Sequence, residues 1–242
     1  MKVSVVIPCY NEENRIENCV SRLSGYLSAK YPDYEIVLSN DGSTDRTASL
    51  ATKAAEADPN VKCVGYERNR GKGCAVRTGM LAAEGDFIIY TDCDLAYGTE
   101  PIGRAVDLAC EKGYGVVLGS RNLDKESYEG YTFTRKIMSK IYLRVISAAS
   151  GFSHSDSQCG FKAYRRDAAR DVFSECEIDS FAFDLEALIK AENKGYKIGE
   201  MPVKIIEHDE SKSKIRPVRD TLKMLRDIRR IKKKEKILRD NK

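Results

Sequence analysis

The stretch Asp86-Phe-Ile-Ile-Tyr-Thr-Asp-Cys-Asp94 is central to the fold assignment, because it joins an apolar run to two carboxylates. The run Phe87–Tyr90 has the length and composition of a strand buried on both faces. Asp92 and Asp94 follow where that strand ends. In open, mostly parallel sheets, ligands bind beyond the carboxyl ends of the strands. We therefore expect a central strand that carries two carboxylates to a ligand site.

Strand and helix patterns alternate on both sides of this stretch through the first 120 residues. Short β-rich runs are expected at Val3–Ile7, Glu35–Ser39, Val61–Tyr66, Asp86–Thr91 and Gly115–Leu118. Helices are expected between them, at Glu12–Ala29, Thr44–Ala57, Gly73–Ala83 and Glu100–Cys110. This alternation, with short connections, predicts an α/β fold with a single, mostly parallel, Rossmann-like sheet flanked by helices.

The pattern changes beyond residue 120, and we interpret this half as an elaboration of the same domain. A polar loop at 121–131 precedes the remaining features, which are a helix near Thr132–Ala149, a Gly- and Ser-rich turn leading to Cys159–Tyr164, a helix at Phe183–Asn193, and a hairpin or bent strand at Lys197–Ile206. The length of 242 residues suits one large domain, or one domain with an appendage.

Charge is unevenly distributed along the chain. Between residues 216 and 242 there are twelve Lys or Arg and four Asp or Glu, a net charge of +8, which leaves −4 for residues 1–215 out of a total of +4. An acidic body with a basic tail indicates that the tail meets an anionic partner. The acidic body argues against a nucleic-acid-binding protein.

The basic tail has the pattern of an amphipathic helix that begins at Pro217. Its apolar side would carry Val218, Leu222, Met224, Leu225, Ile228 and Ile231. Its other side would carry Arg219, Lys223, Arg226, Arg230, Lys233 and Lys234. Such a helix either lies in an anionic membrane interface or packs on the body or a partner with its basic face in solvent. We expect the membrane interface.

Two more polar clusters follow or precede predicted elements. Asn40–Asp45 comes after an apolar strand, and Asp41 projects from the end of that strand. Asp41 either serves only in a capped βα-turn or also contacts the base or ribose of a nucleotide. Asn69–Gly73 places two glycines and two cations before a helix, so its N–H groups and Lys72 suit a phosphate-bearing ligand. Asp92 and Asp94 suit a hard divalent cation that binds a diphosphate.

Six motifs occur in order along the chain: VVIPCYNEENRI, VLSNDGSTDRT, NRGKGCAVRTGM, FIIYTDCDLA, DSQCGFKAY and FAFDLEALIKAENKGYKIGEMPVK. Together they resemble the family 2 inverting glycosyltransferases, and within them the dolichyl- or polyprenyl-phosphate hexosyltransferases. The resemblance covers roughly residues 3–213 and implies a GT-A catalytic domain at 1–213, followed by the basic helix at 214–242.

The resemblance also implies roles for matching positions. The residues that would contact the nucleoside are Pro8, Tyr10, Glu12 and Asp41. Asp92 and Asp94 would bind a Mg²⁺ or Mn²⁺ ion that bridges the diphosphate. The cations facing the lipid phosphate or the leaving diphosphate are Arg121 and Arg135. The acceptor side, near the reacting sugar, comprises Asp156, Gln158, Gly160 and Lys162, and a mobile loop that covers the substrate contains Ser211 and Lys212. Asp94, Arg121 and Asp156 are the expected catalytic residues.

Two departures from the family pattern bear on the donor. The usual paired aspartates of the second motif are here Asn40-Asp41, which leaves recognition of the base open. Mannosyl-transferring relatives often carry Gln two residues after the D-x-D, where this chain has Leu95-Ala96. The dolichyl-phosphate glucosyltransferase branch and UDP-glucose are therefore favoured over GDP-mannose.

The expected reaction is transfer of glucose to a polyprenyl or dolichyl phosphate with inversion. A phosphate monoester has a second pKa of about 6 and is already anionic, so it needs cations for positioning more than a general base. The alternatives are a mannosyltransferase, a transferase acting on a polysaccharide or soluble glycan, and a sugar-nucleotide-binding regulatory module. No apolar window reaches the roughly 18 residues of a membrane span, and the eight scattered cysteines fit a reducing compartment. We expect a cytoplasmic protein, peripheral at the cytoplasmic membrane face.

Overall fold

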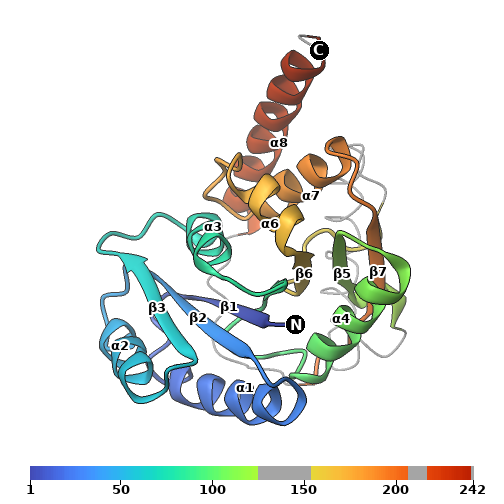
Figure 1. Ribbon diagram of the computed structural model, residues 1–242. Helices are drawn as coiled ribbons and strands as arrows, with labels where there is room; N and C mark the ends of the chain where they lie inside the picture. Colours follow the sequence, from blue (N-terminus) through green and yellow to red (C-terminus); the bar gives the residue numbers. More distant parts are fainter. Residues whose placement is uncertain (125–153, 207–216, 241–242) are drawn as a thin grey trace.

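The computed structural model describes residues 1–124, 154–206 and 217–240 (Figure 1). Within these residues a single seven-stranded sheet has the order β3-β2-β1-β4-β6-β5-β7. Its strands are β1 (Val3–Cys9), β2 (Tyr34–Asp41), β3 (Val61–Tyr66), β4 (Phe87–Tyr90), β5 (Val116–Ser120), β6 (Lys162–Arg165) and β7 (Ile198–Pro202). The predicted single sheet is confirmed.

The sheet is mostly parallel, with one reversed strand. β1 pairs in parallel with β2 and β4, β2 with β3, and β5 with β7. β6 lies between β4 and β5 and is antiparallel to both. The chain that enters β6 therefore arrives at the edge where β4 and β5 end, and this brings the segment before Lys162 to the predicted ligand-binding edge.

Helices cover both faces of the sheet (Figure 1). The helices are α1 (Ile16–Lys30), α2 (Thr47–Ala57), α3 (Lys72–Ala82), α4 (Glu100–Lys112), α6 (Arg166–Phe173), α7 (Phe183–Asn193) and α8 (Pro217–Asp240), with a 3₁₀ turn η1 (Arg121–Leu123). Residues of α1, α2 and α4 pack into one core, and residues of α3, α6, α7 and α8 into the other. β1 serves both cores because its side chains alternate: Val5 and Ile7 face the first and Val6 the second.

Several predicted boundaries shift in the structure. α1 begins at Ile16 and not at Glu12, because Asn11 adopts a left-handed φ of 54° and the next residues form a turn. The α6 helix was not predicted. Of the two alternatives for Lys197–Ile206, the hairpin is wrong, since β7 is a single strand that pairs with β5. The helix expected near residues 132–149 lies outside the described residues.

The helix α8 packs on the body through part of its apolar side. Met224, Ile228 and Ile231 are only 2%, 2% and 3% exposed and belong to the second core. The hydroxyl of Ser180 donates to Asp227 of α8 at 2.6 Å. The described part of the apolar face is therefore used inside the molecule, while Lys223, Arg226, Arg229, Arg230 and Lys232–Lys234 are exposed. None of the described helices has the length and apolar character needed to cross a bilayer.

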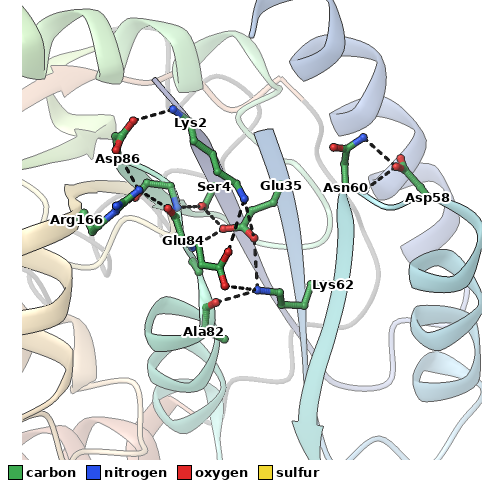
Figure 2. A network of polar contacts seen from close by, with 12 residues as sticks. Lys2, Ser4, Glu35, Asp58, Asn60, Lys62, Ala82, Glu84, Asp86 and Arg166 are labelled. Carbon is green, nitrogen blue, oxygen red and sulfur yellow. Dashed lines mark hydrogen bonds and ion pairs between the residues drawn. The ribbon is translucent and has the colours of Figure 1, made fainter. Parts of the chain in front are cut away.

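A buried carboxylate organises the amino ends of the central strands (Figure 2), at the opposite edge of the sheet from the D-x-D. Glu35 accepts hydrogen bonds from the Ser4 hydroxyl at 2.6 Å and from the Glu84 backbone N–H. The ammonium groups of Lys2 and Lys62 lie 3.8 and 3.6 Å from it. Burial alone would raise the pKa of Glu35, but these hydrogen bonds and cations outweigh it and hold the pKa below its ordinary value. This network joins β1, β2, β3 and the start of β4 (Figure 2).

Candidate active site

The candidate site lies at the carboxyl edge of the sheet, where β1, β2, β4 and β5 end. Asp41 ends β2, the Asp92-Cys93-Asp94 turn follows β4, and Arg121 follows β5. The segment that enters the antiparallel β6 adds Asp156 from the same edge. The topology thus gathers residues that are far apart in sequence, as expected for parallel strands that end together.

Asp41 is buried and its carboxylate is turned toward the loop before α3. It accepts from the Tyr66 hydroxyl at 2.6 Å, the Asn69 side chain at 2.9 Å, and the backbone N–H groups of Arg70 and Gly71 at 2.9 and 3.0 Å. These four donors mean that the carboxylate first holds the glycine-rich loop in shape. Contact between Asp41 and a nucleoside stays a prediction.

The glycine-rich loop places Lys72 beside the D-x-D. The Lys72 ammonium lies 2.6 Å from Asp92 Oδ1. Burial would lower the pKa of Lys72, but the carboxylates of Asp92, Asp184 and Asp94 together outweigh burial and raise the pKa. The loop can approach the neighbouring segment only because it carries glycines: a Cβ at Gly71 or Gly73 would lie 2.5 or 2.4 Å from a backbone oxygen of residues 178–179. Lys72 therefore keeps its charge at the D-x-D.

The two carboxylates of the D-x-D suit a divalent cation. Burial, and then the neighbouring charge of Asp92, raise the pKa of Asp94. Asp94 Oδ1 accepts the Ala96 N–H at 3.1 Å, and Asp92 lies against Gly160, where an added Cβ would be 2.3 Å from Asp92 Oδ2. Two hard oxygen donors with mutual repulsion are the ligand type that Mg²⁺ and Mn²⁺ prefer. Two carboxylates occupy only part of the coordination shell of such an ion, so Asp92 and Asp94 fit a cation that also binds oxygens of a ligand.

Arg121 and Asp156 form a bidentate pair at the end of β5. Arg121 Nε and Nη2 donate to Asp156 Oδ2 and Oδ1 at 2.7 and 2.9 Å, and the Arg121 backbone N–H donates to Oδ2 at 3.2 Å. Asp156 is 0% exposed. A carboxylate engaged by three donors is suited to orienting a guanidinium and poorly suited to removing a proton. The remaining N–H groups of Arg121 can still reach an anion.

Lys162 lies deeper than the resemblance implies. Its side chain is 0% exposed, and its ammonium donates to the Cys159 carbonyl at 2.7 Å and to Asp184 Oδ1 at 2.8 Å. The Tyr90 hydroxyl donates to the same oxygen of Asp184. Burial lowers the pKa of Lys162 to about 7 and raises the pKa of Asp184. Lys162 therefore faces buried partners here, and a direct contact with the acceptor stays a prediction.

Sequence reasoning missed Asp184 and Tyr90 as members of the site. The available signal was a carboxylate flanked by the apolar residues Phe183 and Leu185 at the start of a helix, because an acidic residue that becomes buried needs a partner. Its partner is not evident from sequence, since Lys162 lies 22 residues away and meets Asp184 only through the order of the strands.

The other predicted residues have varied surroundings. Glu12 pairs with Arg15 at 2.6 Å, and Gln158 has a buried side-chain nitrogen for which the described structure gives no hydrogen-bond partner. Pro8 and Tyr10 are partly exposed around the end of β1. Their roles stay predictions. Arg135, Ser211 and Lys212 lie outside the described residues.

Solved structures with the same architecture identify the fold. Glucosyl-3-phosphoglycerate synthase from Mycobacterium tuberculosis, solved in complex with Mn²⁺, UDP and glucosyl-3-phosphoglycerate, aligns with a TM-score of 0.66 at 18% identity, over 95% of this chain and 78% of that one. A structure of the same enzyme with Mg²⁺ and UDP gives 0.65 at 19% identity, over 95% and 77%. At this identity the match establishes the fold, which is that of a GT-A glycosyltransferase.

Sequence comparison gives the family. Residues 4–173 match the model of glycosyl transferase family 2, and the chain belongs to this family. A dolichyl-phosphate beta-glucosyltransferase of Dictyostelium discoideum is 33% identical over 241 residues, covering 95% of this chain and 73% of that protein. The protein of that name in Drosophila melanogaster is 34% identical over 242 residues, covering 94% and 73%. The resemblance drawn from the motifs, and the branch it favours, are confirmed.

Proposed function

We propose that the protein transfers glucose from UDP-glucose to a polyprenyl or dolichyl phosphate, with inversion at the anomeric carbon. The observation that carries this proposal is that the ion pair of Lys72 with Asp92 and the bidentate pair of Arg121 with Asp156 both lie at the ligand-binding edge of a GT-A sheet. The alignment with dolichyl-phosphate beta-glucosyltransferases over 94–95% of the chain supports the choice of donor and acceptor.

On the donor side, the anomeric C–O bond breaks while negative charge builds on the departing UDP. Asp92 and Asp94 would hold Mg²⁺ or Mn²⁺, and such an ion supplies charge stabilisation to the diphosphate. Lys72, held beside Asp92 at 2.6 Å, adds a fixed positive charge on the same side. The N–H groups of the glycine-rich loop are oriented by Asp41, so the loop is preorganised before the donor binds.

On the acceptor side, an oxygen of the lipid phosphate forms the new bond to the anomeric carbon. The phosphate is already an anion at neutral pH, so no proton has to be removed from it. Arg121, held by Asp156, orients that anion. On the strength of the family resemblance, Arg135 is a further cation for the lipid phosphate or the leaving diphosphate, and Ser211 and Lys212 belong to a mobile loop that covers the substrate. Asp156 acts by orienting Arg121.

The basic face of α8 supplies the contact with the membrane that contains such a lipid. Met224, Ile228 and Ile231 are buried against the body, so this contact is electrostatic and runs through exposed cations such as Lys232 and Lys233. Cations near an anionic surface contribute on the order of 1 kcal/mol each, and salt screens them. This supports a peripheral position at the cytoplasmic membrane face.

Sedimentation with vesicles tests the membrane contact. The protein should pellet with vesicles that contain phosphatidylserine at low salt and be released at high salt. It should stay in solution with neutral phosphatidylcholine vesicles. Lys232→Glu combined with Lys233→Glu should abolish pelleting while leaving the fold unchanged by circular dichroism. Salt-resistant binding to both vesicle types would contradict an electrostatic contact.

The transferase proposal is tested by supplying radiolabelled UDP-glucose, GDP-mannose and UDP-N-acetylglucosamine in parallel to a polyprenyl phosphate in detergent, with Mg²⁺ or Mn²⁺. UDP-glucose should give an organic-extractable, mild-acid-labile product that EDTA prevents. Asp94→Asn should abolish it, while Asp107→Asn, the same change at an exposed position on α4, should not. Preference for GDP-mannose would move the protein to the mannosyltransferase branch, and activity on free sugars alone would overturn the lipid acceptor.

A further inference from the structure

Three buried side chains from three elements meet beneath the candidate site. Lys162 begins β6, Tyr90 ends β4, and Asp184 lies in the first turn of α7. The Lys162 ammonium is 2.8 Å from Asp184 and 5.5 Å from the centre of the Tyr90 ring. Tyr90 and Lys162 are also register partners in the antiparallel pair of strands. We call these three residues the buried triad.

The buried triad is joined to both halves of the candidate site. Tyr90 precedes the D-x-D aspartate Asp92 by two residues. Lys162 donates at 2.7 Å to the carbonyl of Cys159, and the Cys159 N–H in turn donates to the carbonyl of Asp156 at 3.4 Å. The loop at 156–160 is thus held near its end by the hydrogen bond of the Lys162 ammonium to Cys159. It is held at its start by Arg121, which donates two side-chain hydrogen bonds to the Asp156 carboxylate.

Stability alone gives a weak account of the buried triad. Enclosing an ammonium and a carboxylate costs desolvation energy that their attraction only partly returns, and apolar replacements are often as stable. Both side chains here are buried, and the Asp184 oxygen that meets Lys162 also accepts from Tyr90. What this arrangement provides, and an apolar cluster would not, is a directed hydrogen bond to one particular carbonyl, that of Cys159.

We propose that Lys162, Asp184 and Tyr90 are positioning residues that hold the loop at 156–160 against the end of β4. Asp184 and the Tyr90 ring fix the direction of the Lys162 ammonium, and the ammonium fixes Cys159. The loop then keeps Asp156 on Arg121 and keeps Gly160 against Asp92. The catalytic part of this inference rests on the proposed function, because the loop lies on the acceptor side of that reaction.

The test uses a variant that removes both charges at once, Lys162→Met with Asp184→Asn, so that no buried group is left without its counter-charge. Misplacing a group near the reacting atoms by about 1 Å can cost on the order of 10²-fold in rate, so kcat should fall by about that factor. The KM for UDP-glucose should stay near its wild-type value, because the nucleoside side is built on β1 and β2. Tyr90→Phe keeps the ring and loses one hydrogen bond, so its kcat should fall less.

A control variant at the opposite edge separates positioning from general stability. Glu35→Gln disturbs another buried carboxylate with lysine partners and two hydrogen bonds, but it lies at the amino ends of the strands (Figure 2). It should lower the free energy of unfolding and leave kcat unchanged. Unchanged kcat in the double variant, or a rise in KM without a fall in kcat, would overturn the positioning role.

Hydrogen exchange gives a readout that does not require the transferase reaction. In the double variant, amides in a peptide covering residues 155–161 should exchange faster than in the wild type, while those of β1 and β2 should not. Equal protection of the loop in both proteins would overturn the inference, whatever the activity. If the wild type transfers no sugar to a polyprenyl phosphate, the proposed function fails, and the exchange data still decide whether the buried triad holds the loop.

Discussion

Charged groups at the carboxyl edge of the sheet are held by protein partners before any ligand binds. Arg121 is gripped by Asp156, Lys72 lies on Asp92, and Asp41 is surrounded by N–H and O–H donors. Groups that are already oriented need little reorganisation when charge develops in the transition state. For single residues of the site, we therefore expect the geometry of an ion pair to affect the reaction rate more than its net charge does.

Replacing Arg121 with lysine tests this point. Lysine keeps the charge and loses the planar fork that binds both oxygens of Asp156, so kcat should fall by about 10–10²-fold although the charge is conserved. The matched control is Arg165→Lys. That change alters an exposed two-point contact with Asp167 at the opposite edge and should leave kcat unchanged in the same transfer assay. Equal effects would show that the fork at Arg121 is unimportant.

Gly160 sets how closely the loop can approach the D-x-D. A Cβ there would lie 2.3 Å from Asp92 Oδ2, so Gly160→Ala should displace the carboxylate, weaken Mn²⁺ binding and raise the Mn²⁺ concentration needed for half-maximal activity. Titrating Mn²⁺ in the transfer assay measures the shift in half-maximal concentration. Gly25→Ala, in open space on α1, should instead raise the free energy of unfolding by about 0.5–1 kcal/mol without changing that concentration. An unchanged Mn²⁺ requirement in Gly160→Ala would contradict this account of the contact.

Among the elements, α8 is tied to the body by both apolar and polar contacts. Ile228 lies in the second core, Ser180 bonds to Asp227, and Glu177 meets Arg230 and Lys234 on the surface. The surface pairs contribute little because solvent screens them, so the buried side chains hold the helix in place. The helix is therefore part of the folded unit, and between residues 223 and 234 its exposed side chains are all cations.

Urea unfolding of Ile228→Ala measures this docking. Removing a buried isoleucine side chain should lower the free energy of unfolding by about 2–5 kcal/mol. The control Arg226→Ala, at an exposed position two residues earlier, should stay within about 0.5 kcal/mol of the wild type. A similar small effect in both variants would mean that α8 does not pack on the body in solution.

The elements that could be predicted from sequence are those in which a local pattern of apolar residues is enough to distinguish a strand from a helix. Phe87–Tyr90 and Phe183–Asn193 appear as expected because their apolar runs suit only one kind of element in that context. The start of α1 was misplaced because the turn after Asn11 depends on hydrogen bonds to the Asn40–Asp45 cluster from β2, such as Asn11 N–H to Ser43 at 3.1 Å. Such long-range contacts leave no local periodicity.

For the site, sequence located the strand ends but not the partners. The D-x-D was predictable because carboxylates after a buried strand must lie at its carboxyl end. The depth of Lys162 was not, since it depends on β6 running antiparallel between β4 and β5, and a four-residue strand has no sequence signal for its direction. The resemblance supplied the order of motifs, and only the fold supplied which side chains meet.

In the molecule as a whole, two sets of charged residues lie at opposite ends of the strands of the sheet. The Glu35 network (Figure 2) lies at the amino ends of the strands and joins elements together, whereas the D-x-D, Lys72 and Arg121 lie at the carboxyl ends. We expect substitutions in the first set to change stability and substitutions in the second set to change the reaction. The two sets should therefore respond separately to pH and to mutation.

Acid unfolding tests the first set. The pKa of Glu35 is lower in the folded chain than its ordinary value of 4.5, so the unfolded chain binds more protons there and stability rises with pH. Its contribution is complete above about pH 5 and is lost as the pH falls through the folded pKa. Urea unfolding from pH 7 to pH 3 should show a shallower loss in Glu35→Gln than in the wild type. Glu56→Gln, exposed on α2, should follow the wild-type curve.

The reversed strand β6 has a consequence for how such a protein can diversify. The chain leaves the sheet after Ser120 and returns at Lys162, both at the same edge, and the Arg121–Asp156 pair closes the excursion close to its two ends. Because the ends are fastened together, the intervening segment can lengthen, shorten or be exchanged without altering the register of any strand. If the acceptor binds on this side, as we propose, selection for a new acceptor can act on this segment while the strands that carry the proposed donor contacts keep their positions.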